Sequence, residues 1–307
     1  MKKVLVTGAS GFIGQAAVPL LVKNKFSVTA LTRGKERLFG SSVRYVRADL
    51  SRAVPPFALK NINAVVHLAG EININASIED PRANIEHNLA MTFNVLEAVR
   101  KSGNKPLAIF ISTDRVYGHT KRRAVDEEER PFPIEPYAAS KMLSETLFEL
   151  YAHLYGIPYI VLRFDSVYGP HQPREMFISD LIQKMHKDAL VKTGSLAVRK
   201  NFVYVADAAD AIVRSLRAPV SAHNTVYNIG GKSYALSQVA AEIAREMSKR
   251  AGKKIFVRAN ALPGRPARIE VRPFNLSTKK AFHMLHWRAK TPLTEGLRHT
   301  IDYFLQP

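Results

Sequence analysis

Tyr137 and Lys141 are the residues whose types and spacing most directly suggest chemistry in this sequence. They are four positions apart, so a helix over residues 137–155 would place phenol and ammonium on one face, about one turn apart. A nearby ammonium favours phenolate and lowers the pKa of a phenol from about 10 toward a range where it can take up a proton at neutral pH. Either Ser112 or Thr113, at the end of a short apolar strand, could supply a hydroxyl to the same oxygen. Because Tyr and Lys at this spacing also occur on ordinary amphipathic helices, the assignment depends on the rest of the chain.

A glycine-rich turn follows the first apolar stretch of the chain. Residues 4–7 are typical of a buried strand, and residues 15–23 resume at helical spacing. The turn between them holds Gly8, Gly11 and Gly14. Glycines allow a tight turn and a close approach of the backbone to a pyrophosphate, while the helix N-terminus offers free N–H groups and the positive end of the helix dipole. Strand, glycine turn and helix in this order predict a dinucleotide site.

The end of the second predicted strand indicates which dinucleotide is bound. Residues 27–32 form this strand, and Arg33 follows it at the place where a carboxylate would hydrogen-bond the adenosine ribose hydroxyls. A guanidinium suits a 2′-phosphate instead, and Arg37 is close enough in sequence to assist. Asp49 follows the third predicted strand and is placed to accept a hydrogen bond from the adenine amino group. The expected cofactor is therefore NAD(P), with NADP favoured over NAD.

Strands and helices alternate regularly over the first half of the chain. Two further apolar strands, at residues 63–70 and 107–112, flank a predicted helix over residues 84–100. This alternation predicts a Rossmann-type α/β fold, in which a doubly wound parallel sheet carries the chemistry at the carboxyl ends of its strands. At that edge the small residues Ala69 and Gly70 would let the backbone lie against the cofactor.

The chain is expected to divide into a cofactor-binding domain and a smaller lobe. The sequence pattern becomes less regular from about residue 171 onward. We expect an NAD(P)-binding domain over residues 1–166, to which about residues 200–230 return. Residues 167–199 and 231–307 then form a C-terminal substrate-binding lobe.

The overall composition limits the class of protein. Of the 307 residues, 46% are hydrophobic and 23% charged, which is typical of a globular protein. No apolar run approaches the roughly 18 residues that would cross a bilayer, and the first residues carry no signal-peptide pattern, so we expect a cytoplasmic protein without membrane association. The absence of cysteine excludes disulfides and thiolate catalysis. The ten histidines lack metal-ligand spacing, so no metal site is expected.

The charge balance is strongly basic. The sequence has 45 Lys and Arg against 26 Asp and Glu, a formal net charge of +19. A field of that sign attracts nucleic acid, anionic membrane surfaces and phosphorylated small molecules alike, and it does not choose among them. The basic clusters within residues 121–123 and 249–254 are short and lack interleaved aromatic residues, so we expect no specific nucleic-acid partner.

Further motifs occur in a fixed order along almost the whole chain. They are Thr7-Gly8 with Gly11 and Gly14, Asp49-Leu50, His67-Leu68-Ala69, Asp80-Pro81 with Asn88, Ser112-Thr113-Asp114-Arg115-Val116-Tyr117-Gly118, Tyr137-x-x-x-Lys141, Leu162-Arg163, Val167-Tyr168-Gly169-Pro170, Phe202-Val203-Tyr204-Val205, Tyr227-Asn228-Ile229-Gly230-Gly231 and Arg265-Pro266. Together they resemble the extended short-chain dehydrogenase/reductase family, specifically its nucleotide-sugar epimerases and dehydratases. The cofactor-binding residues that we expect on this basis are Gly8, Gly11, Phe12, Ile13, Gly14, Arg33, Asp49, Leu50, Leu68, Ala69, Gly70, Asn88, Tyr137 and Lys141.

The resemblance also implies roles for the residues of the reactive site. In such enzymes the matching Tyr is general base and acid on a sugar hydroxyl, the Lys lowers its pKa and holds the nicotinamide ribose, and a Ser or Thr orients the hydroxyl. Carried over, these are Tyr137, Lys141 and Thr113, with Ser112 as support. Lys200 stands where the family usually has an Arg, and Arg265 matches an Arg that contacts the substrate diphosphate. The implied substrate-binding residues are Asp114, Arg115, Ser166, Lys200 and Arg265.

Departures from the family pattern bear on the reaction. Thr113-Asp114 is similar to the Thr-Asp-Glu triplet of sugar 4,6-dehydratases, but Arg115 replaces the Glu, and a guanidinium cannot take a carbon-bound proton. Ser166 stands where many members have an Asn, so the sugar and the nucleotide stay open.

We therefore expect a nucleotide-sugar epimerase that acts by transient hydride transfer through a 4-keto sugar. An NADPH-dependent reductase of a 4-keto sugar or another carbonyl is the first alternative, followed by a 4,6-dehydratase and by a non-catalytic nucleotide-binding protein. Members of the family are commonly homodimers through a four-helix bundle, which the helices over residues 84–100 and 137–155 could supply.

Overall fold

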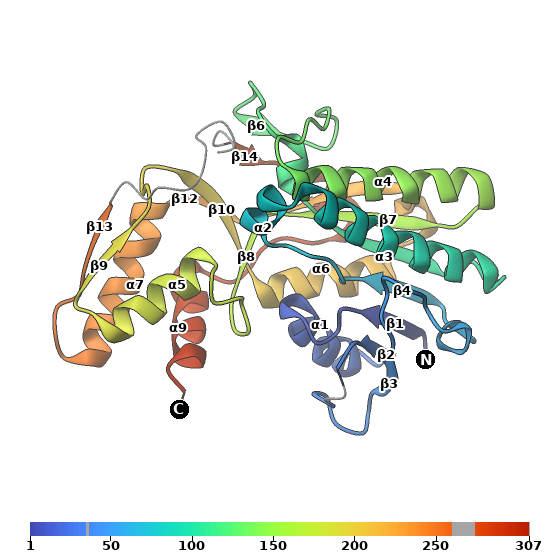
Figure 1. The fold of residues 1–307 in the computed structure, drawn as a ribbon, viewed down its shortest axis with the longest axis horizontal. Helices are drawn as coiled ribbons and strands as arrows, with labels where there is room; N and C mark the ends of the chain where they lie inside the picture. The colour runs from blue at the N-terminus through green and yellow to red at the C-terminus, as the bar shows by residue number, and fades with distance from the viewer. Residues whose placement is uncertain (35–36, 260–273, 307) are drawn as a thin grey trace.

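A single parallel sheet positions most of the predicted site. The computed structural model describes residues 1–34, 37–259 and 274–306, and its main sheet has seven parallel strands with helices on both faces (Figure 1). In spatial order the strands are β11 (Thr225–Ile229), β7 (Tyr159–Phe164), β5 (Leu107–Thr113), β4 (Ala64–His67), β1 (Lys3–Thr7), β2 (Ser27–Thr32) and β3 (Arg44–Arg47). This arrangement confirms the predicted Rossmann-type doubly wound α/β fold.

Successive side chains of a strand point to opposite faces of the sheet. The helices therefore pack on the sheet through two separate apolar clusters, one on each face. The elements on the two faces are α1 (Phe12–Lys23), α2 (Ile74–Glu79), α3 (Pro81–Lys101), α4 (Pro136–Tyr155), α6 (Val205–Arg217) and α8 (Lys279–Leu285). Val4 and Val6 of β1 belong to a cluster with α1 and α6, whereas Leu5 belongs to a cluster with α3 and α4. Figure 1 shows the two pairs of helices on opposite sides of the sheet.

The second half of the chain adds a smaller lobe beside the sheet (Figure 1). Its helices are α5 (Phe177–Lys187), α7 (Leu236–Ala251) and α9 (Leu293–Phe304), which share a third apolar cluster. Its small sheets are β12 (Lys232–Ala235), β10 (Arg199–Tyr204) and β8 (Ser166–Tyr168) in one, and β13 (Phe256–Ala259) and β9 (Leu190–Thr193) in another. The remaining elements are β6 (Ala124–Val125), paired with β14 (Asn275–Leu276), and the short 3-10 helices η1 (Pro56–Leu59), η2 (Asp114–Tyr117) and η3 (Val220–Ala222).

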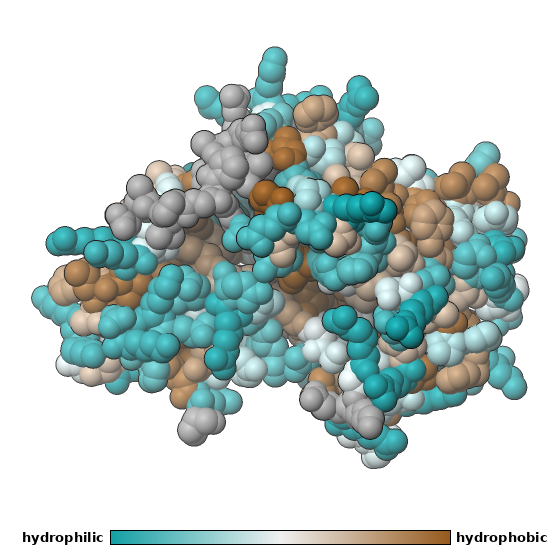
Figure 2. All heavy atoms as spheres, in the orientation of Figure 1, coloured by the Kyte–Doolittle hydropathy of each residue, from teal (hydrophilic) through white to brown (hydrophobic). Residues whose placement is uncertain are grey.

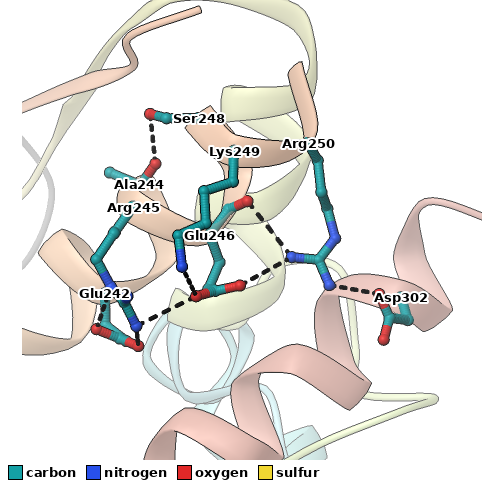
Figure 3. A network of polar contacts seen from close by, with 8 residues as sticks. All are labelled: Glu242, Ala244, Arg245, Glu246, Ser248, Lys249, Arg250 and Asp302. Carbon is teal, nitrogen blue, oxygen red and sulfur yellow. Dashed lines mark hydrogen bonds and ion pairs between the residues drawn. The ribbon is translucent and has the colours of Figure 1, made fainter. Parts of the chain in front are cut away.

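Charged side chains join α7 to α9 in this lobe (Figure 3). Arg250 donates to Glu246 Oε2 at 3.2 Å and to Asp302 Oδ1 at 2.6 Å. Glu246 also forms ion pairs with Arg245 and Lys249. The basic partners and Asp302 are partly exposed, so we expect a modest contribution from these pairs, and the apolar cluster beneath them does most to hold α7 and α9 together. Among the residues that the structure describes, no helix combines the length and apolarity needed to cross a bilayer.

Candidate active site

The glycine turn after β1 brings two backbone segments into close contact. A side chain on Gly8, whose φ is +64°, would place its Cβ 2.6 Å from the backbone nitrogen of Ala69. A Cβ on Gly14 would lie 2.4 Å from the carbonyl oxygen of Gly8. Gly11 precedes α1 without any side-chain cap, so the N-cap residue leaves the N–H groups of the first helical turn, which contains Phe12 and Ile13, for another acceptor. This cradle fits the pyrophosphate of a dinucleotide.

A second wall of the predicted cofactor site lies at the ends of β4 and β5. A Cβ on Gly70 would be 3.2 Å from Lys141 Nζ and 3.3 Å from Asn88 Oδ1. Asn88 Oδ1 accepts from the backbone N–H of Glu71 at 2.8 Å, and its Nδ2 donates to Ser140 Oγ at 2.9 Å. Asn88 therefore ties the segment after β4, where Leu68 and Ala69 lie, to α4. The structure thus brings the glycine turn, Gly70, Asn88 and Lys141 to one edge of the sheet, as the sequence predicts.

The adenosine end of the predicted cofactor site is rich in cations. Arg33 is exposed at the end of β2, and Arg47 Nε donates to its carbonyl oxygen at 3.1 Å. Asp49 is exposed after β3, and hydrogen bonds from the hydroxyl and the backbone N–H of Ser51 hold the pKa of its carboxyl below the ordinary value. Leu50 is buried beside it. Both predicted polar contacts to the adenosine, Arg33 and Asp49, are therefore available at the surface.

Tyr137 lies in the first turn of α4, next to the end of β5. The hydroxyl of Thr113 lies close enough to the phenol to influence its pKa, so these two predicted catalytic residues lie together. The same hydroxyl donates to Asp114 Oδ1 at 3.3 Å. Burial raises the pKa of Tyr137 above its ordinary value. The carboxylate of Glu135 and that of Asp114 raise it further, while Arg115 and Thr113 act in the opposite direction. The phenol therefore holds its proton at neutral pH, which differs from the lowered pKa expected from the sequence.

Lys141 faces the cofactor side of the site. Its ammonium donates to the carbonyl oxygen of Ile111 at 2.9 Å and lies 4.7 Å from the ring centroid of Phe110. Burial lowers the pKa of Lys141 to about 8, although Glu145 opposes the shift. The helical spacing predicted that Lys141 shares a helix face with Tyr137 and lowers its pKa. Burial and Glu135 have a larger effect on the pKa of the phenol than Lys141 does.

The depressed pKa of Lys141 predicts a pH-dependent stability. Between about pH 8 and the ordinary lysine value of 10.5, the unfolded chain binds more protons at this position than the folded chain. Stability therefore rises with pH over this window. We expect the free energy of unfolding of wild type, relative to Lys141→Met, to increase across it in urea denaturation. A difference that stays flat over the same range would contradict the burial of the ammonium.

Ser112 is placed differently from Thr113. Its hydroxyl donates to Glu145 instead of approaching the phenol. Arg163 donates to Glu145 Oε2 at 2.6 Å and to Tyr117 Oη at 2.9 Å, and Tyr117 donates to Asn228 Oδ1 at 2.8 Å. All five side chains are buried. Ser112 thus belongs to a polar network beneath the site. The sequence analysis did not identify Glu145, the acidic member of this network, which lies four residues after Lys141.

Two neighbouring carboxyls, the partly buried Asp114 and the buried Asp165, mark the predicted substrate side. Burial raises the pKa of Asp114 well above its ordinary value, and Asp165 raises it further, while Lys200 acts in the opposite direction. Burial also raises the pKa of Asp165, although Asn201 donates to its Oδ2 at 2.6 Å. The shift favours the neutral form of Asp114 over its carboxylate. Ser166 adjoins this pair, since its backbone N–H donates to Asp165 Oδ1.

An ion pair between Arg115 and Glu135 lies next to the phenol. Arg115 Nε donates to Glu135 Oε1 at 2.8 Å, with 15% of the Arg115 side chain and none of the Glu135 side chain exposed. Within the described part of the chain, Glu135 Oε2 is buried without a hydrogen-bond partner. The sequence analysis did not single out Glu135, although its position two residues before Tyr137 was a signal that it lies near the phenol. Arg265 lies outside the described residues.

The chain is similar to known proteins over nearly its whole length. A family model described as the NAD dependent epimerase/dehydratase family matches residues 4–230. A putative UDP-glucose 4-epimerase of Methanocaldococcus jannaschii is 32% identical over 310 residues, which cover 98% of this chain and 97% of the relative.

Two solved structures have similar folds. The UDP-glucose 4-epimerase of Thermotoga maritima with UDP-glucose has a TM-score of 0.84 and 28% identity, covering 98% of both chains. The UDP-glucuronic acid 4-epimerase of Bacillus cereus, in complex with UDP-glucuronic acid and NAD, has a TM-score of 0.84 and 28% identity, again covering 98% of both chains.

Proposed function

The chain belongs to the NAD-dependent epimerase/dehydratase family, as its motifs predicted, and from that membership we propose that it is a UDP-sugar 4-epimerase using NAD(P). The observation that carries the proposal is the proximity of the Thr113 hydroxyl to the phenol of Tyr137, beside the cofactor edge formed by Gly70 and Lys141. The UDP-sugars named for the similar proteins support the nucleotide part.

The geometry assigns each reactive side chain a task. As phenolate, which the positive charge of a bound oxidised nicotinamide would favour, Tyr137 takes the proton of the C4 hydroxyl as that carbon becomes a ketone, and it later returns a proton to the same oxygen while Thr113 holds that oxygen in place. A bound nicotinamide supplies acceptance and return of the hydride. Because burial and Glu135 keep the pKa of Tyr137 high, the phenol is suited to the proton-donating half of the cycle. The ammonium of Lys141, at the cofactor edge, is available to bind the cofactor ribose.

Arg115 favours epimerisation over dehydration. Elimination of water needs a base that removes a carbon-bound proton, and a guanidinium ion-paired with Glu135 cannot do so. Inversion at C4 needs only the proton transfer at Tyr137 and return of the hydride to the other face of the ketone.

Product analysis tests this function. The protein is incubated with UDP-sugars and small amounts of NAD or NADP, and the products are separated by chromatography. The expected result is the C4 epimer without net change in reduced cofactor. Stoichiometric oxidation of NADPH by a 4-keto sugar would support the reductase instead.

We also propose that the cofactor is NADP in preference to NAD. Arg33 and Arg47 form a cationic edge at the end of β2 and β3, which suits a 2′-phosphate. Arg33→Ala is expected to weaken NADP binding about tenfold or more and NAD binding much less, since only NADP loses a charge-assisted contact. Calorimetric titration of both cofactors measures this, with the remote exposed Arg82→Ala as control. Equal weakening of both cofactors would remove the case for phosphate recognition.

A homodimer through α3 and α4 remains our proposal for the assembly. Exposed apolar side chains on these helices include Phe93 (42% exposed), Leu150 (45%) and Leu154 (56%). Figure 2 shows apolar atoms gathered over the C-terminal end of α4. Packing of α3 and α4 from two copies would cover this surface as a four-helix bundle.

The predicted division of the chain into a cofactor domain and a substrate lobe is likewise a proposal. The place of β11 in the main sheet and the packing of α6 on α1 support the return of residues 205–229, whereas β10 pairs with β8 and β12 in the smaller lobe. Ala281, Leu285 and Trp287 pack in the same apolar cluster as α1. We therefore assign α8 to the cofactor domain.

A further inference from the structure

The guanidinium of Arg115 is fixed at one end and free at the other. Its Nε is held by Glu135, whose side chain is fully buried. The two terminal nitrogens make no hydrogen bond to any residue that the structure describes, and 15% of the side chain is exposed, so a ligand can reach them. An Arg presents its N–H groups in a planar fork that matches a carboxylate, whereas a hydroxyl uses only one of them.

Arg115 lies where it can meet the sugar next to the reacting carbon. Its charge acts on both Tyr137 and Asp114, the two side chains that flank it in the site. In a hexose, C6 is attached to the carbon beside C4. A group on C6 must therefore lie close to the oxygen that Tyr137 holds.

Two cations act on the predicted substrate side of the site. Arg115 is paired with the carboxylate of Glu135, and Lys200 acts on both Asp114 and Asp165. Burial and the neighbouring Asp165 raise the pKa of Asp114, which favours its neutral form. A substrate carboxylate would therefore share the fork of Arg115 with Glu135, and the charge of Lys200 would offset part of the added negative charge.

We propose that Arg115 binds the C6 carboxylate of a nucleotide-linked hexuronic acid, with Glu135 as the positioning residue that holds the guanidinium in the required orientation. This inference rests on the proposed UDP-sugar epimerase function and deepens it by naming the class of sugar. It also assigns a role to the residue that departs from the dehydratase triplet.

Binding without turnover tests the proposal. The full-length protein with Tyr137→Phe, loaded with NAD or NADP, is titrated calorimetrically with UDP-glucuronate, UDP-glucose and UDP. We expect UDP-glucuronate to bind about tenfold or more tighter than UDP-glucose, as charge-assisted hydrogen bonds to a carboxylate allow. Arg115→Met in this background should bring the ratio of the two dissociation constants close to one. The control is Arg122→Met, which removes a more exposed guanidinium outside the site and should leave the ratio unchanged.

Two further variants separate positioning from folding. Arg115→Lys keeps the charge but not the fork and should lose most of the preference. Glu135→Gln keeps the shape of the side chain and should lose part of it, and thermal unfolding of each variant reports whether the fold is intact. A wild-type site that binds UDP-glucose as tightly as UDP-glucuronate, or a ratio unchanged by both Arg115 variants, overturns the inference and leaves the epimerase function standing. Failure of all three nucleotides to bind overturns both.

Discussion

Tyr137→Phe is expected to lower turnover at least about a hundredfold, the low end of the effect of losing a general acid–base group. The substitution removes only the hydroxyl that Thr113 contacts and leaves the ring in the first turn of α4. Lys141 and the glycine turn are unchanged, so the cofactor should still bind. The measurement is the rate of C4 epimer formation at saturating UDP-sugar, together with the dissociation constant of NAD or NADP.

A matched control separates loss of chemistry from loss of structure. Tyr155 ends the same helix, is 39% exposed and lies away from Thr113. Tyr155→Phe should therefore retain turnover. If Tyr137→Phe kept most of the wild-type rate, the phenol would not be the group that moves the proton, and a non-catalytic nucleotide-binding protein would become the better interpretation.

The sequence was most informative where local patterns decide the structure. The strand, glycine turn and helix from residue 3 to residue 23 follow from backbone geometry alone, and the structure has all three. The parallel sheet follows because strands alternate with helices, and this brings the end of β5 next to the start of α4. The proximity of Thr113 and Tyr137 was therefore predictable, and the structure places the two side chains close together.

The two neighbouring hydroxyls at the end of β5 show where the sequence alone left a choice open. Successive residues of a strand point to opposite sides, so Ser112 and Thr113 could not both serve one oxygen. Thr113 meets the phenol, whereas Ser112 points to Glu145. The alternation was available in the sequence, but which of the two faces Tyr137 depended on how α4 packs on the sheet.

The acidity of the phenol was not readable from the spacing of Tyr137 and Lys141. Burial is a property of the whole fold, and it raises the pKa of Tyr137 while lowering that of Lys141. Glu135 adds to the first effect from the position just before α4. Helical spacing predicts which side chains share a face, but solvation and neighbouring charges decide their protonation.

The buried network beneath the site predicts the largest change in stability. Glu145→Ala would leave Arg163, whose side chain is 5% exposed, without its carboxylate partner. Breaking such a buried pair costs about 3–5 kcal/mol, because the remaining charge stays uncompensated away from water. We expect a loss of this order in the free energy of unfolding from urea denaturation.

An exposed ion pair serves as the control that shows whether the loss of stability depends on burial. Arg82 and Glu86 form an ion pair with 85% and 60% of their side chains exposed, so Glu86→Ala should cost less than about 1 kcal/mol. Equal losses for Glu145→Ala and Glu86→Ala would show that the network contributes nothing beyond a surface contact.

Adding Arg163→Met to Glu145→Ala should recover part of the stability, because the double variant no longer holds an unpaired buried charge. Arg163 also donates to Tyr117, which lies in η2 together with Arg115. An unpaired Arg163 in the single variant is therefore expected to disturb the site around Arg115 as well as the stability of the fold.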